Sequence, residues 1–393
     1  MGFEDLFLGW RTAALGLLIL EIVVLAGMIM VADPDRAPPR LLAGALLVIS
    51  GLLTPYAIGF AGAYDVWRGL TFAPFAIPLA LGPLLYAYAS ALETGRAPRH
   101  IAWHATPAGV QLAYLIVCFL LPTSFKWAWY TGGHNAFVAP VFSSLTLVSL
   151  GGYAWAIGRV LARYRARLAD NRSDDDRFSA RWLSRVRFTI LITLVIEVGF
   201  WLWAFLTGGI DYFQETGLYL VLGAIGLYLG VAGWRQTGLP ALAEDTAHFP
   251  IRPPTLDPTD GGQGGPDWAT IAADFAARTR AEAWWREPGL TLPGLARRLA
   301  TNTGKLSRAI NLGLGMNFST FINSLRAEGV AEALAAHSET DLLDLAFEMG
   351  FASKASFNRA FHARYGTTPS KYRRDVSDRD SLAAATDLRR AGT

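Results

Sequence analysis

Apolar residues dominate the chain up to Trp234, in long runs that short polar segments separate. A helix needs ~20 residues to cross a hydrocarbon core of ~30 Å, and seven of the runs are long enough. They lie near residues 12–32, 41–63, 70–92, 104–121, 137–160, 186–206 and 215–234. The pattern predicts a bundle of seven transmembrane helices over residues 1–235, with kinks at prolines inside the runs, such as Pro55 and Pro107.

The loops between these runs differ in their positive charge. One set holds nine arginines from Arg159 to Arg187, together with Arg36, Arg40, Arg96, Arg99 and Arg235. The other set holds Arg11, Arg68 and Lys126. Because Lys and Arg are enriched in cytoplasmic loops, we expect a multi-pass protein of the bacterial inner membrane, with its N-terminus outside and its C-terminal part in the cytoplasm. The first run follows Glu4 and Asp5 rather than a basic cluster, so we expect it to be retained and not cleaved as a signal peptide.

The polar segments mark the domain boundaries. The arginine-rich stretch from Arg163 to Arg167 is expected to extend the fifth helix into the cytoplasm. Residues 236–266 are rich in Pro and Gly without apolar periodicity, which predicts a flexible linker. Asp267 is then expected to cap a helix. Residues 267–375 are predicted to form a second domain, followed by a disordered tail over 376–393.

Two helix-turn-helix patterns occur within this second domain. In the first, Asn302 caps the second helix, and the apolar positions that face the core are Leu295, Ala296, Leu299, Leu306 and Ile310. In the second, Gly350 makes the tight turn and Ser353 the cap, and the core positions are Leu345, Ala346, Met349, Phe357 and Phe361. A long helix near residues 318–336 is expected to connect the two units.

The second helix of each pattern leaves a set of side chains on its outer face. A recognition helix places such side chains against base edges in the major groove, where Arg suits guanine and Asn suits adenine. We therefore predict that the chain binds double-stranded DNA through Thr303, Lys305, Ser307, Arg308, Asn311, Lys354, Ser356, Asn358, Arg359 and His362.

The second pattern also resembles a known family. The motif Gly350-Phe351-x-Ser353-x-x-Ser356-Phe357-x-Arg359-x-Phe361, with Tyr365-Gly366-x-Thr368-Pro369 after it, closely resembles AraC/XylS-type transcription regulators. Leu306-Ser307-Arg308 and Phe321-Ile322-Asn323-x-x-Arg326 look like the first motif and the connecting helix of that family. The resemblance implies a seven-helix DNA-binding domain with recognition helices in two successive major grooves. More weakly, Gly82-Pro83-Leu84-Leu85-Tyr86 and Arg181-Trp182-Leu183 look like the membrane-anchored branch of the family.

Ionisable and aromatic residues of the apolar half suggest a place for a signal. Charged groups are costly inside a membrane and usually face the bundle interior, and Glu21, His104 and Glu197 lie in or near the predicted spans. Aromatic residues gather near the outer ends, where an interfacial belt would also place them. We hypothesise a ligand-sensing site at Glu197, Trp201 and Trp203.

Composition narrows the function classes. Hydrophobic residues make up 52% of the chain and charged ones 17%, and the net charge is +3, so the overall balance does not itself indicate nucleic acid. The single cysteine allows no intramolecular disulfide. The six histidines are scattered, and we find no G-x-S-x-G motif or phosphate-binding glycine loop, so no enzyme, metal site or cofactor is expected.

Together, the patterns predict an all-α protein: a seven-helix transmembrane bundle followed by a cytoplasmic DNA-binding domain. The leading hypothesis is a membrane-embedded one-component transcription regulator, with DNA, the lipid bilayer and an unidentified small-molecule or membrane ligand as partners. An intramembrane enzyme or transporter with a regulatory tail, and a membrane anchor with proteolytic release, stay open as alternatives. So does a homodimer.

Overall fold

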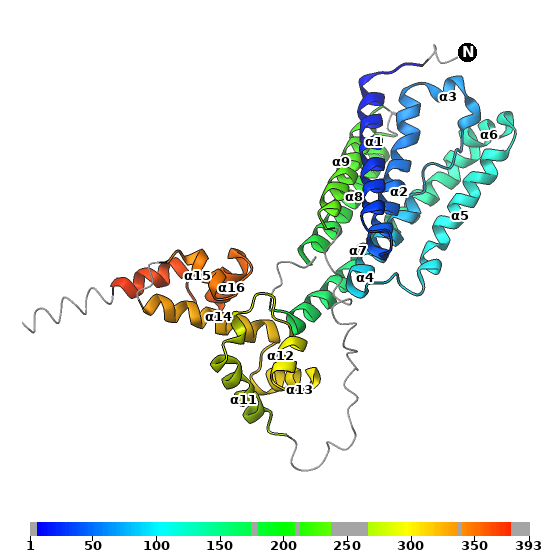
Figure 1. Cartoon of the computed structure of the whole chain (residues 1–393). Helices are drawn as coiled ribbons and strands as arrows, with labels where there is room; N and C mark the ends of the chain where they lie inside the picture. The colour runs from blue at the N-terminus through cyan, green and yellow to red at the C-terminus, as the bar shows by residue number, and fades with distance from the viewer. Residues whose placement is uncertain (1–5, 174–179, 209–212, 237–265, 337–339, 379–393) are drawn as a thin grey trace, which may run out of the picture. The chain divides into compact units, whose positions relative to one another are not determined.

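The computed structural model describes residues 6–173, 180–208, 213–236, 266–336 and 340–378. Within these ranges the chain is helical and forms no named β-strand, which confirms the all-α prediction. The chain divides into two compact units (Figure 1). The first comprises residues 1–162 and 179–245, and the second comprises residues 163–178 and 246–393. Nearly all of the predicted linker and tail lies outside the described residues.

The first unit consists of long apolar helices. Its main helices are α1 (Trp10–Ala32), α2 (Ala37–Phe60), α4 (Leu81–Thr94), α5 (Ile101–Leu120), α6 (Thr123–Trp129), the π-helical η4 (Tyr130–Val138), α7 (Ala139–Asn171), α8 (Ala180–Thr207) and α9 (Thr216–Trp234). Short turns α3 (Ala63–Val66), η2 (Arg68–Leu70) and η3 (Pro78–Ala80) precede α4. Among the described residues, six helical stretches are long and apolar enough to cross a membrane, judged by length and composition alone.

The third expected span, near residues 70–92, is not one continuous helix, and that prediction is wrong in this respect. Proline lacks the N–H that a helix interior requires, and Pro74 and Pro78 fall in the first half of the expected span. The chain there is irregular, and α4 begins only at Leu81. Two buried side chains pair with the irregular backbone. Lys126 Nζ donates to the Gly69 carbonyl at 2.6 Å, and the Leu79 N–H donates to Gln111 Oε1 at 3.3 Å.

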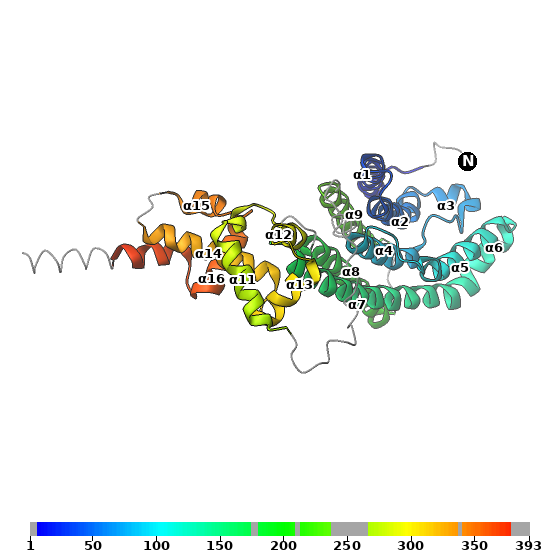
Figure 2. The ribbon, with the colours of Figure 1, turned by 60° about the horizontal axis from the view of Figure 1, so that its bottom comes forward.

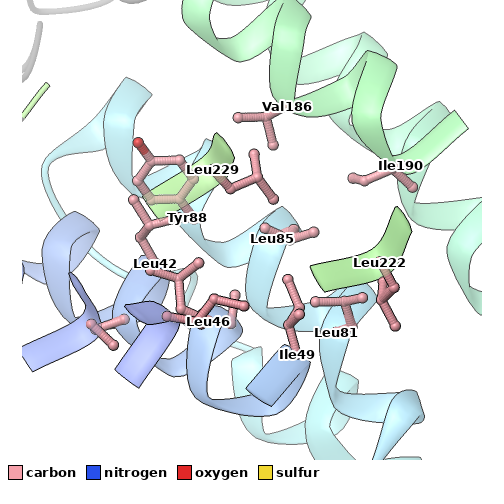
Figure 3. Packing of buried hydrophobic residues seen from close by; sticks show 14 of the residues in the cluster. Leu42, Leu46, Ile49, Leu81, Leu85, Tyr88, Val186, Ile190, Leu222 and Leu229 are labelled. Atoms are coloured by element: carbon pink, nitrogen blue, oxygen red, sulfur yellow. The ribbon is translucent and has the colours of Figure 1, made fainter. Parts of the chain in front are cut away.

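Helices α1, α2 and α9 lie side by side, and α4 packs on α2 (Figures 1 and 2). Figure 3 shows the apolar core between these helices and α8, where Leu46, Leu85 and Val186 are buried. Close approach of α9 depends on a small residue, because a Cβ added at Gly226 would lie 2.8 Å from Ile49 and 2.9 Å from Ile22. Small residues that let backbones approach are typical of helix packing in membranes.

Two hydrogen bonds hold the first half of α8 in place. Trp182 Nε1 donates to the Tyr88 hydroxyl on α4 at 2.6 Å. Arg187 Nε donates to the Ala154 carbonyl on α7 at 3.1 Å. With its first turns fixed in this way, α8 carries Glu197 and Trp201 along a defined face of the same helix.

Helix α7 continues beyond the apolar stretch as one helix to Asn171, which confirms the predicted extension of the fifth span. From Leu150 onward, buried side chains recur about every three or four residues along α7: Leu150, Ala154, Ile157, Val160, Leu161, Tyr164 and Leu168. This spacing places them on one face of the helix. The part of α7 from Arg163 to Asn171 belongs to the second compact unit.

The second unit is a small helical domain with its own core. Its helices are α11 (Trp268–Ala281), the 3₁₀ turn η6 (Trp284–Arg286), α12 (Leu292–Arg298), α13 (Thr303–Arg308), the π-helical η7 (Ala309–Gly313), α14 (Phe318–Ala335), α15 (Leu342–Glu348) and α16 (Lys354–Tyr365). Residues 369–378 are also helical. The buried core draws side chains from all of the named helices, including Phe275, Leu295, Ile322 and Phe357. Asp267 caps α11 as expected, and the hydrogen bonds from Thr270 lower the pKa of its carboxyl group.

Candidate DNA-binding interface

The start of each predicted recognition helix is set by a side-chain cap. Asn302 Oδ1 accepts a hydrogen bond from the Lys305 N–H at 2.7 Å at the start of α13. Ser353 Oγ accepts one from the Ser356 N–H at 3.2 Å at the start of α16. Such caps satisfy backbone donors that a helix leaves unpaired at its first turn. Both predicted caps are confirmed.

The turn before α16 requires glycine. Gly350 has φ of 87°, in the left-handed region that glycine adopts most readily. A Cβ atom at this position would also overlap the carbonyl group of Arg286. The predicted tight turn is therefore confirmed, and its geometry brings the backbone close to the segment that precedes α12.

The core faces of the two recognition helices are buried as predicted. On α13 and η7, Leu306 is 0% exposed and Ile310 is 2% exposed. On α16, Phe357 is 2% exposed and Phe361 is 0% exposed. This burial orients the opposite faces of both helices away from the domain core.

The outer face of the first recognition helix carries the expected polar side chains. Lys305 and Asn311 are exposed, whereas Thr303, Ser307 and Arg308 are partly exposed. Asn311 Nδ2 donates to Ser307 Oγ at 3.3 Å, so these two side chains lie together. Asn311 belongs to the π-helical turn η7 that follows α13.

The second recognition helix contributes a more continuous surface. Lys354, Asn358, Arg359 and His362 are exposed, and all four line a groove of about 840 Å³. The other side of the groove is formed by residues 341–343 and 368–370.

Ser356 is not oriented as predicted. It is 8% exposed, and its Oγ donates to the Ser353 carbonyl at 2.8 Å. The serine belongs to the cap of α16, because a hydroxyl one turn into a helix can donate to the carbonyl three residues before it. The expectation that Ser356 points outward is therefore corrected.

Charge on these helices has one sign. Neither α13 nor α16 contains Asp or Glu, whereas together they carry Lys305, Arg308, Lys354, Arg359 and Arg364. Of these, Arg364 already pairs with Glu328 on α14, at 3.1 Å. Positive side chains suit contact with phosphate groups, which provide most of the sequence-independent affinity for DNA.

A buried arginine on α14 connects the two helix-turn-helix units. Arg326 is 1% exposed, and its guanidinium donates to the carbonyls of Trp285 and Glu287, each at 2.8 Å. It also lies over the Phe351 ring, 5.9 Å from the centroid. The segment before α12 and the turn before α16 thus contact the same side chain. The sequence indicates Arg326 only as part of a family motif, because its partners lie about 40 residues away.

Ser173, which follows α7, is hydrogen-bonded into this same region. Its N–H and its Oγ both donate to the Leu290 carbonyl, at 3.2 and 2.9 Å. The Ser173 carbonyl accepts from Asn323 Nδ2 at 3.1 Å, and its Oγ accepts from Arg326 Nη2 at 3.2 Å. The neighbouring residue, Arg172, forms an isolated antiparallel bridge with Thr291, the cap of α12. No sequence signal pointed to this contact, because the two partners are 117 to 153 residues apart.

The hypothesised ligand residues of the first unit separate into two groups. Glu197 and Trp201 both line a cavity of about 420 Å³. Trp203 is not among the lining residues; it is 47% exposed, and its ring lies 5.8 Å from that of Phe200. Glu197 and Trp201 are four residues apart and share a helix face, whereas Trp203 projects elsewhere.

Comparison with known proteins identifies the C-terminal part of the chain. Residues 295–375 match a family described as helix-turn-helix domain, and the AraC-type assignment of this domain is confirmed. An uncharacterized HTH-type transcriptional regulator of Bacillus subtilis (strain 168), YtdP, is 32% identical over 87 residues, which are 22% of this chain and 11% of that protein. One of Staphylococcus aureus (strain MSSA476) is 35% identical over 86 residues, again 22% of this chain and 11% of that protein. No solved structure matches the chain.

Proposed function

We propose that this chain, whose C-terminal part is an AraC-type helix-turn-helix domain, is a membrane-embedded transcription regulator. In this proposal the domain binds specific sequences of double-stranded DNA in the cytoplasm, and the helices of the first unit control it. The printed names of the two relatives, both HTH-type transcriptional regulators, support transcription regulation as the output. Their similarity covers 22% of this chain, so membrane control rests on other observations.

Two features support membrane embedding: the length of the apolar helices, and the burial of the segment whose backbone is not helical. Six helical stretches of the described chain have the length and composition of membrane spans. The segment from Arg68 to Leu81 is not helical throughout, and membranes tolerate such backbone only where it is buried in protein. Lys126 and Gln111 pair with that backbone and are each 4% exposed. We propose that this segment and α4 together form the third crossing, which preserves seven crossings and opposite sides for the two termini.

The observation that carries control by the first unit is the contact of Ser173. Helix α7 runs without interruption from Ala139 to Asn171, and its residues divide between the two compact units. The next residues, Arg172 and Ser173, are bonded to Thr291 and Leu290 at the start of the first helix-turn-helix. Any movement of α7 along or around its axis would therefore act on the DNA-binding domain directly. This route does not pass through the linker over residues 236–266.

The same contact bears on proteolytic release. Cleavage within residues 236–266 would sever one covalent connection but leave the Ser173 hydrogen bonds with Leu290, Asn323 and Arg326 in place. We therefore favour regulation by movement over simple release from an anchor. Formation of a homodimer and contact with a ligand stay predictions of the sequence.

A selection experiment tests the proposed function. Full-length protein in lipid nanodiscs is incubated with a library of random DNA duplexes, and bound sequences are enriched over several rounds. We expect a specific sequence to emerge, and a reporter gene that carries it to respond in bacterial cells. The matched control is the Arg308→Ala, Arg359→Ala double variant in the same nanodiscs. If that variant enriches the same sequence equally well, or if no sequence is enriched, the proposal is wrong.

A further inference from the structure

The first unit contains a cavity that the proposed DNA-binding function does not use. Its volume is about 420 Å³, within the range that small-molecule sites occupy. Helices α2, α5, α7, α8 and α9 all contribute lining residues. A site at the meeting point of several helices of a bundle is a common place for a ligand.

The charged groups that line the cavity are all acidic. Glu197 on α8 and Glu215 at the start of α9 line it, and no Lys or Arg is among the lining residues. Glu215 is hydrogen-bonded by Tyr56, whereas no described residue donates a hydrogen bond to Glu197. A carboxylate in such surroundings is stabilised by a cation that occupies the cavity, because a buried unpaired charge is costly.

Most of the other lining residues are aromatic or apolar, and Gln111, His134, Ser143, Thr146 and Thr193 add polar groups. Tyr56 and Tyr219 stack with ring centroids 3.4 Å apart on one side. Phe142, Phe200 and Trp201 contribute further aromatic surface. Aromatic faces attract cations and also cover the apolar body of a ligand. The lining therefore suits a molecule with a positive group at one end and a hydrocarbon or aromatic group at the other.

A metal ion fits this lining less well than an organic cation. Among the described residues, no three His, Cys, Asp or Glu side chains come together as metal ligands. The lining histidine, His134, already pairs through Nδ1 with the Tyr114 hydroxyl at 2.9 Å. Carboxylates accept hydrogen bonds and cannot donate them, so an ammonium with N–H donors satisfies both glutamates.

We propose that this cavity binds a primary ammonium compound with an aromatic or aliphatic body, and that Glu197 and Glu215 hold the ammonium group. The role of this compound as the signal of the regulator rests on the function proposed above. Binding of the compound to the cavity does not depend on that function. Glu197 and Trp201 lie on α8, whose earlier residue Arg187 bonds to the Ala154 carbonyl of α7. Occupation of the cavity would thus act on α7, the helix that Ser173 follows.

Equilibrium dialysis with radiolabelled 2-phenylethylammonium tests binding to full-length protein in nanodiscs, with empty nanodiscs as the blank. The comparison ligand is 2-phenylethanol, which has the same carbon skeleton and no charge. We expect saturable binding of the ammonium compound at one site per protein, at least tenfold tighter than that of the alcohol. Glu197→Gln and Glu215→Gln should each weaken it at least tenfold.

Glu21→Gln serves as the matched control, since Glu21 lies on α1 and does not line the cavity. It should leave binding unchanged, and size-exclusion profiles should show that all three variants are folded. Equal affinity for the amine and the alcohol, or unchanged binding by Glu197→Gln, would overturn the proposal. Binding is measured without DNA, so its loss is distinguishable from failure of the regulator function. The latter would appear as normal amine binding with no sequence-selective DNA binding.

Discussion

Ser173 Oγ accepts a hydrogen bond from Arg326 Nη2 at 3.2 Å, and each of the two residues is 1% exposed. Ser173 follows α7, whereas Arg326 lies in the middle of α14, the helix between the two helix-turn-helix units. The contact therefore joins the end of a helix that begins in the apolar unit to a buried residue of the DNA-binding domain.

Ser173→Ala should loosen this contact without changing the DNA-contacting surface. The substitution removes the hydroxyl that bonds with Leu290 and Arg326, and a buried donor left unpaired costs about 1–3 kcal/mol. We expect amide hydrogen exchange over residues 285–335 of the full-length protein to become faster. The free energy of local opening should fall by about 1–3 kcal/mol. Ser370→Ala, at an exposed serine of the same domain, should have no such effect. Unchanged exchange in Ser173→Ala would show that the contact is not significant for the domain.

Arg308 and Arg359 are expected to contact base edges. Replacement of either with alanine should weaken binding to the selected sequence by about 1–3 kcal/mol and relax specificity at a few positions. Arg278→Ala is the control, because Arg278 is an exposed arginine on α11 that belongs to neither recognition helix and pairs with Asp274. DNase footprints and titrations at one fixed salt concentration measure the effect. If both arginine variants give unchanged footprints, the assignment fails.

Lys305 and Lys354 are expected to contact phosphates instead. Both are exposed and lie in the first turn of their recognition helices. Lys305→Gln and Lys354→Gln should weaken binding to all sequences by a similar factor. Each should also reduce the slope of log affinity against log salt concentration by about 1. A change in sequence preference with an unchanged slope would contradict this role.

Gly350→Ala should destabilise the second helix-turn-helix. The positive φ of 87° disfavours alanine, and the added Cβ would overlap the Arg286 carbonyl. We expect a loss of at least about 1 kcal/mol in the stability of the domain, measured by thermal unfolding of the full-length protein. Gly304→Ala is a fitting control, since the nearest atom to its added Cβ, Asn302 Oδ1, lies 3.4 Å away. Equal stability of the two variants would contradict the turn assignment.

The proposed third crossing determines the topology. Reporter fusions after Asp65 and Gly133 should be external, and fusions after Ala97 and Asp174 should be cytoplasmic. Asp65 and Ala97 lie on either side of the irregular segment with α4. Gly133 and Asp174 come after the next two spans. If fusions after Asp65 and Ala97 report the same side, the segment with α4 does not cross, and the two termini share one side of the membrane.

Local features of the DNA-binding domain were accessible from the sequence. The caps at Asn302 and Ser353 and the turn at Gly350 depend on backbone groups within a few residues, so residue type alone indicates them. The burial of Leu306 and Phe361 follows equally from helical periodicity. Periodicity also separates Trp203 from Glu197 and Trp201, although the sequence hypothesis grouped all three.

Tertiary structure decided the features that depend on distant partners. Prolines indicate the helix break before α4. The irregular backbone at this break is stabilised by hydrogen bonds with Lys126 and Gln111, which come from later helices. The Ser173 contact depends on groups more than a hundred residues away, at Leu290 and Arg326. Hydrogen bonds of this kind form only where folding brings the groups within about 3 Å in a water-free site, and no local pattern encodes that approach.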